Sequence, residues 1–81
     1  MTVILVRYFA AARAAAGVNE EKVAAPDLAT LLSVISQAHG PTLATVLDRC
    51  SFLVDGLACH DRSVPLPADT VVDVLPPFAG G

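Results

Sequence analysis

Apolar residues form short, nearly continuous runs near both ends of the chain and recur at helical spacing in between. Thr2–Phe9 and Thr70–Leu75 are rich in β-branched and aromatic residues, which favours a strand at each end. Asp27–His39 begins with an N-cap residue and carries one apolar stripe, typical of an amphipathic helix. The stripe consists of Leu28, Leu31, Leu32, Ile35 and Ala38. Because such a stripe must be buried, the chain is expected to pack this helix on a sheet.

Shorter elements are predicted between these three. Ala10–Ala16 has high helix propensity and ends at Gly17, a residue that suits a helix C-terminus. Glu20–Ala24 is expected to be a weak strand whose charged residues face water. Asp55-Gly56 is a signal for a tight hairpin turn. The remaining expectations are a helical turn over Thr42–Leu47 capped by Thr42, strands over Phe52–Val54 and Leu57–His60, and a loop over Asp61–Asp69.

Strict alternation divides the two terminal strands into a helix-facing set and an outward-facing set. The helix-facing set is Ile4, Val6, Tyr8, Val72 and Val74. The outward-facing set is Leu5, Arg7, Phe9, Val71, Asp73 and Leu75. Its apolar members converge beside the end of the last strand, which predicts a docking patch for a partner. Arg7 and Asp73 are expected to form an exposed ion pair on this face that orients the partner.

Composition limits the class of protein. The 81 residues are 54% hydrophobic and 16% charged, which suits one small domain with more apolar residues than its core can hold. The net charge is −3 and Lys and Arg do not cluster, so nucleic-acid binding is disfavoured. No apolar run is long enough to suggest a membrane span. Cys50 and Cys59 are too few for a disulfide scaffold, so we expect free thiols in the cytoplasm.

The sequence ends in Pro76-Pro77-Phe78-Ala79-Gly80-Gly81. The two prolines end the strand ladder and stiffen the start of this segment. We therefore expect a domain over residues 1–75 and a flexible reactive tail over 76–81, with a reach of roughly 20 Å. Gly81 would offer its carboxylate, Gly80 would let it enter a narrow slot, and Phe78 would anchor in a partner pocket.

Two other kinds of site are weighed and set aside. Cys59-His60-Asp61 holds the residue types of a nucleophilic triad. Adjacent strand residues point to opposite faces, however, so a plain hairpin explains this run better. No Cys or His pair has zinc-site spacing, so no metal site is expected. No independent active site is predicted either.

Several motifs together resemble the small subunit of molybdopterin synthase. They are the strand followed by Pro-Pro and Ala-Gly-Gly, the Asp55-Gly56 hairpin, the Leu66–Thr70 turn, and Phe9-Ala10 before an Arg-containing helix. Thiamine-pathway sulfur carriers and ubiquitin share the fold and the ending. The resemblance implies an α+β, ubiquitin-like β-grasp whose mixed sheet has the first and last strands at its centre and one main helix on one face. Family members often have Glu where this chain has Ala14.

The resemblance also implies a chemistry. An ATP-using activating enzyme would adenylate the Gly81 carboxylate, which is then converted to a thiocarboxylate. The sulfur would pass to a cyclic pyranopterin phosphate in the large subunit of the synthase. The chain would be a sulfur-donor subunit of a hetero-oligomer, with no bound cofactor of its own. Two alternatives stay open: a sulfur carrier for thiamine or another thiolation pathway, and a ubiquitin-like protein modifier.

Overall fold

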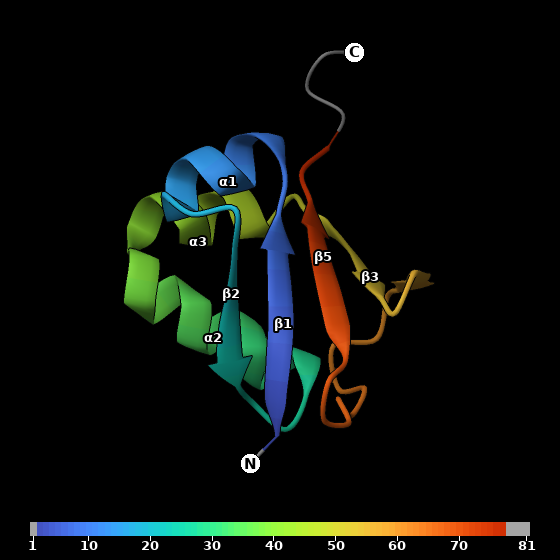
Figure 1. Ribbon diagram of the computed structural model, residues 1–81. Helices are drawn as coiled ribbons and strands as arrows, with labels where there is room; N and C mark the ends of the chain where they lie inside the picture. Colours follow the sequence, from blue (N-terminus) through green and yellow to red (C-terminus); the bar gives the residue numbers. More distant parts are fainter. Residues whose placement is uncertain (1, 78–81) are drawn as a thin grey trace.

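Three helices cover one face of a five-stranded sheet in the computed structural model, which describes residues 2–77 (Figure 1). The strand order across the sheet is β2-β1-β5-β3-β4. The strands are β1 (Val3–Tyr8), β2 (Glu20–Ala24), β3 (Ser51–Val54), β4 (Leu57–Cys59) and β5 (Val71–Leu75). The helices are α1 (Ala10–Ala16), α2 (Leu28–His39) and α3 (Pro41–Leu47). The predicted α+β arrangement, a mixed sheet with the main helix on one face, is confirmed.

The first and last strands lie side by side at the centre of the sheet, as predicted. β1 and β5 run parallel, with Leu5 opposite Val71 and Arg7 opposite Asp73. β2 pairs antiparallel with the other edge of β1, and β3 pairs antiparallel with β5. Two segments far apart in the sequence thus form the middle of the sheet, and both end on the same side of the molecule (Figure 1).

The main helix starts and packs largely as the apolar pattern predicts. The Thr30 backbone N–H donates to Asp27 Oδ1 at 2.7 Å, which confirms Asp27 as N-cap. This hydrogen bond lowers the pKa of the Asp27 carboxyl. Leu28, Leu31, Leu32 and Ile35 are buried, whereas Ala38 is exposed. Ten residues at 3.6 per turn carry Ala38 about 80° from Leu28, to the edge of the stripe.

The start of α3 corrects the prediction that Thr42 caps this helix. Pro41 is its first residue, and Gly40 is the N-cap with φ 93°. Proline suits the first helical position because its missing N–H would have no intrahelical partner there. The left-handed φ of Gly40 lets α2 end and α3 begin at one residue.

Glu21 corrects the expectation that the charged residues of the second strand face water. The register places it opposite Val6, on the helix side of the sheet. Tyr8 Oη donates to Glu21 Oε2 at 2.6 Å, and His39 Nε2 lies 2.5 Å from the same oxygen. Burial and the contact with Glu21 raise the pKa of the Tyr8 hydroxyl. These three side chains connect β1, β2 and the end of α2.

Candidate functional site

The face of the sheet that the helices leave uncovered carries the residues predicted to dock a partner. We call this surface the outer sheet face and define it by Leu5, Arg7, Phe9, Val71, Asp73 and Leu75. The predicted division of the two central strands is confirmed, because all five helix-facing residues are buried. Leu5, Val71 and Leu75 are each partly exposed. Whether the outer sheet face binds a partner stays a prediction.

Phe9 lies at the end of this face that is nearest to the tail. It is 39% exposed and forms the N-cap of α1 without a side-chain hydrogen bond. Its backbone N–H donates to Val74 O at 3.2 Å, which holds it beside the end of β5. The backbone of Phe9 is therefore held at Val74, one residue before the end of β5, while the residue stays partly exposed at the surface.

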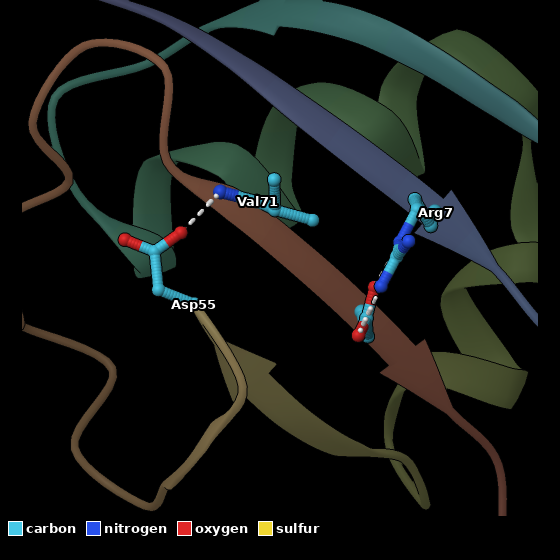
Figure 2. A network of polar contacts seen from close by, with 4 residues as sticks. Arg7, Asp55 and Val71 are labelled. Atoms are coloured by element: carbon cyan, nitrogen blue, oxygen red, sulfur yellow. Dashed lines mark hydrogen bonds and ion pairs between the residues drawn. The ribbon is translucent and has the colours of Figure 1, made fainter.

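Arg7 and Asp73 form the predicted ion pair across the central strands. The Arg7 Nε and Nη2 atoms donate to Asp73 Oδ1 at 2.6 Å and Oδ2 at 2.9 Å, and Figure 2 shows Arg7 reaching from β1 toward β5. The hydrogen bond and the charge of Asp73 raise the pKa of the Arg7 guanidinium further. Such a two-bond fork is the most directional ion-pair geometry in proteins.

The expectation that both members of this pair are exposed is wrong for Asp73. The Asp73 side chain is only 9% exposed, whereas the Arg7 side chain is 45% exposed. Both residues lie on inner strands of the sheet, and Asp73 is flanked by Arg7 on β1 and Leu53 on β3. The difference follows from side-chain length, because the long Arg7 side chain extends to the short Asp73 carboxylate. Its neighbours on both sides cover it, and both of its oxygens are hydrogen-bonded to Arg7.

The start of β5 is held by the hairpin turn between β3 and β4. Asp55 and Gly56 have φ of 50° and 84°, the pattern of a two-residue type I′ turn. Asp55 Oδ1 accepts from the Val71 N–H at 2.8 Å (Figure 2), and the Asp55 N–H donates to Val71 O at 2.8 Å. The predicted turn therefore also fixes the strand that leads to the tail.

Ala10 follows Phe9 in an unusual backbone conformation. Its φ is 50°, in the left-handed region that costs a residue with a Cβ about 1–2 kcal/mol. The Ala12 N–H donates to Phe9 O at 3.0 Å, so the turn of α1 begins at once. The strained residue lies where the chain leaves the sheet for the helix layer, directly after the exposed Phe9.

The other chemically interesting residues form no catalytic triad and no metal site. Cys59 Sγ donates to the Asp61 carbonyl at 3.2 Å, and His60 lies past the end of β4. Burial raises the pKa of the Cys50 thiol to about 11, which keeps it protonated. Within residues 2–77, no three His, Cys, Asp or Glu side chains are placed to hold a metal ion. None of the helices in this range is long and apolar enough to cross a membrane.

Three of the predicted site residues, Phe78, Gly80 and Gly81, lie outside the described residues. The structure does describe the point from which this segment starts. β5 ends at Leu75, and Pro76 and Pro77 follow without secondary structure. The tail therefore begins at the edge of the outer sheet face.

Several solved structures share this fold. Small archaeal modifier protein 1 from Methanosarcina acetivorans is 21% identical with a TM-score of 0.87, covering 100% of this chain and 98% of its own. The protein of the same name from Haloferax volcanii is 19% identical with a TM-score of 0.85, covering 96% and 100%. A chain from the complex of subunits 1 and 2 of molybdopterin-converting factor from Helicobacter pylori is 22% identical with a TM-score of 0.77, covering 99% and 100%. The expected ubiquitin-like β-grasp is confirmed.

The sequence comparisons add the family. No curated protein sequence matches the chain. The model of the ThiS family, in contrast, matches residues 6–81, which include the outer sheet face from Arg7 onward and the whole tail. The chain therefore belongs to the ThiS family of ubiquitin-like sulfur carriers.

Proposed function

We propose that this chain is the sulfur-carrier subunit of a molybdopterin synthase. The observation that carries the proposal is the ThiS family match, which runs through Gly80 and Gly81 at the end of the sequence. The likeness to a chain from the two-subunit molybdopterin-converting factor complex supports a large-subunit partner. The chain resembles the small subunit of molybdopterin synthase at Pro76-Pro77 and around Phe9. This resemblance favours molybdenum cofactor synthesis over other sulfur-transfer pathways.

In the proposed reaction, the Gly81 carboxylate attacks ATP on an adenylating enzyme and becomes an acyl-adenylate with release of pyrophosphate. Hydrosulfide from the sulfur source then displaces AMP and leaves a thiocarboxylate. In the large subunit, the thiocarboxylate sulfur displaces an oxygen substituent from a carbon of the cyclic pyranopterin phosphate and forms a thioester. Hydrolysis of this thioester by water leaves the sulfur on the pterin and returns the Gly81 carboxylate. This chemistry needs no side chain from the carrier, because the reacting group is the Gly81 carboxylate itself. We place these steps in the cytoplasm, where both cysteines stay reduced.

The carrier's own contribution is docking and reach. The outer sheet face presents Phe9 and Leu75 beside the residues at which the tail begins. A partner bound there would hold the root of the tail while residues 76–81 extend by roughly 20 Å at most into its active site. Phe78 would occupy a pocket of the partner on the way, and Gly80 would allow passage through a narrow channel.

Mass spectrometry of the intact chain tests the sulfur chemistry. Incubated with ATP, the adenylating enzyme and a sulfur source, the chain should exchange one oxygen for sulfur at Gly81. Deletion of Gly81 should abolish this exchange without changing the melting temperature, because the tail lies beyond β5. Gly80→Val should impair it, since a β-branched side chain is too wide for the channel. Full sulfur transfer by the Gly81 deletion would refute the proposal.

A second candidate function is protein modification. It is favoured by the two small archaeal modifier proteins, which align over nearly the whole chain with TM-scores of 0.87 and 0.85. A modifier would use the same activated carboxylate to form isopeptide bonds. Peptide mapping of cellular proteins separates the two functions, because a modifier leaves Gly81 linked to lysine side chains and a dedicated sulfur carrier does not.

A further inference from the structure

Cys50 and Cys59 line the same hollow at the β3–β4 hairpin. This hollow has a volume of about 180 Å³, and its lining residues are Cys50, Ser51, Phe52, Cys59, His60 and Arg62. Cys59 lies opposite the buried Phe52 in the strand register, on the helix side of the sheet. Both cysteines also pack against the hydrophobic core. Two thiols from neighbouring segments therefore face one space.

The two thiols differ in their surroundings. Cys59 Sγ donates to Asp61 O at 3.2 Å in an exposed position, whereas Cys50 Sγ donates to Val46 O at 3.2 Å in a half-buried one. Burial raises the pKa of the Cys50 thiol to about 11, which leaves little thiolate at neutral pH. Because the thiolate is the form that attacks a disulfide, we expect Cys59 to react first and Cys50 second.

Arg62 places a positive charge beside Cys59. Its guanidinium carbon lies 5.6 Å from the centre of the Phe52 ring, and Phe52 is the direct partner of Cys59 in the strand ladder. The carboxylate of the neighbouring Asp61 accepts hydrogen bonds from the Ser63 N–H at 2.9 Å and from the Ser63 Oγ at 2.6 Å. Arg62 is therefore the permanently charged side chain of the hollow. A cation at this position attracts anionic reagents.

We propose that Cys50 and Cys59 form a thiol pair that reduces low-molecular-weight disulfides bearing carboxylates and closes into an intramolecular disulfide. In the first step, the Cys59 thiolate attacks one sulfur of the reagent, the S–S bond of the reagent breaks, and one half leaves as a thiolate. In the second step, the Cys50 thiolate attacks Cys59 Sγ and releases the other half. The protons lost by the two cysteines end on the two released thiols. The cysteines thus lose the two electrons that the reagent gains.

Closure requires a small movement at Cys50. In a regular ladder Cys50 would be the diagonal neighbour of Cys59, about 7–8 Å away, whereas disulfides usually join Cα atoms no more than about 6.8 Å apart. Cys50 precedes β3, and its N–H donates to Leu47 O of α3 rather than to a neighbouring strand. The movement therefore breaks no ladder hydrogen bond of Cys50. A disulfide formed in this way is strained, and strained disulfides are readily reduced again.

The thiol pair goes beyond the proposed function, because neither cysteine takes part in the chemistry at Gly81. In a reducing cytoplasm both thiols stay reduced, and the pair closes when oxidised low-molecular-weight disulfides accumulate. The closed pair would restrain the β3–β4 hairpin, whose Asp55 holds the start of β5 through the Val71 N–H. A chain that forms no thiocarboxylate but still closes this disulfide would overturn the proposed function alone.

Intact-mass spectrometry of the reduced full chain with oxidised glutathione provides the test. Wild-type chain should pass through a transient glutathione adduct and end as a monomer that is lighter by two hydrogens. Cys50→Ser should stop at a stable adduct on Cys59, because the second thiol is missing. Cys59→Ser should react more than about tenfold more slowly than Cys50→Ser, since its remaining thiol is mostly protonated. A lasting adduct on the wild-type chain, or equal rates for the two variants, would overturn the proposal.

Two disulfides of opposite charge test the contribution of Arg62. Arg62→Gln should slow the reaction with oxidised glutathione roughly threefold and should not slow the reaction with cystamine, a cationic disulfide. Arg13→Gln removes the same charge from α1 and is the matched control, so both rates should stay at the wild-type value. Wild-type rates for Arg62→Gln with both reagents would contradict the preference for anionic disulfides. Melting temperatures of the reduced variants show that they fold, and Cys50→Ala repeats the test without a buried hydroxyl.

Discussion

The two faces of the sheet are built from the same strands, but the helices cover only one of them. On the helix side, Val6, Tyr8 and Val74 are buried by the chain itself. On the outer side, Leu5 and Leu75 are left partly exposed around an ion pair. Both faces carry apolar residues, so apolar content does not distinguish them. The difference lies in the cover, since the outer face has no helix over it within residues 2–77.

This difference separates folding from binding. Residues of the covered face determine stability, and their replacement should lower the free energy of unfolding. Residues of the outer sheet face contribute less to stability and are available to a partner. A surface that is apolar, polar at one defined point and adjacent to the root of the tail has the features of an interface. The comparison predicts that mutations on the two faces have separable effects.

The largest effect is expected on the covered face. Leu32→Ala should lower the free energy of unfolding by about 2–5 kcal/mol, because Leu32 is 5% exposed and its truncation leaves a cavity under α2. Val34→Ala on the same helix is the matched control, since Val34 is 38% exposed and should change stability much less. Urea unfolding with an unchanged m-value measures both. Equal effects would contradict the placement of α2.

The next effect concerns the polar network on the same face. Glu21→Gln should lower the free energy of unfolding by about 1–3 kcal/mol, because Glu21 Oε2 contacts both Tyr8 and His39. Glu20→Gln, one residue earlier and exposed, should be nearly neutral. Thermal melts of the two variants give the comparison directly. Unchanged stability of Glu21→Gln would show that this polar network does not stabilise the covered face.

These residues also show how far sequence reasoning extends. Alternation predicts the faces of β1 and β5 correctly because the two strands pair in an uninterrupted parallel register, so successive residues point to opposite faces. The prediction for Glu21 is wrong although a period of two places Glu21 on the same face as Val23, which packs against the core. A second signal is Tyr8, the single tyrosine, whose buried hydroxyl requires a partner. Only the strand register identifies that partner as Glu21.

The burial of Asp73 and the backbone strain at Ala10 could not be predicted from the sequence, for different reasons. Asp73 is buried by neighbours on two other strands, which requires the strand order as well as the alternation. Ala10 has high helix propensity, and propensity carries no information about the left-handed φ at the first helical position. Glycine would have signalled that conformation, but the chain has alanine there.

On the outer sheet face, Phe9→Ala should reduce partner affinity with little change in stability. We expect a loss of more than about 1 kcal/mol in binding to the large subunit or the adenylating enzyme, since exposed aromatic anchors dominate interfaces. Leu57→Ala is the control, because Leu57 is 75% exposed and lies in β4, at the far edge of the sheet. Titration calorimetry and a thermal melt of each variant test both statements. Equal losses of partner affinity in the two variants would show that Phe9 does not contribute to the interface.

The smallest effect is expected where the chain passes from one layer to the other. Ala10→Gly should raise the free energy of unfolding by about 0.5–1 kcal/mol, because glycine adopts the φ of 50° without the Cβ clash. Ala14→Gly, in the interior of α1, should instead lower it by about 0.5–1 kcal/mol, since glycine there only adds unfolded-state entropy. Two identical substitutions in one helix are thus expected to have opposite signs. Urea unfolding of both variants, with equal m-values, measures the two signs. Destabilisation by Ala10→Gly would show that neighbouring contacts favour alanine there despite its backbone strain.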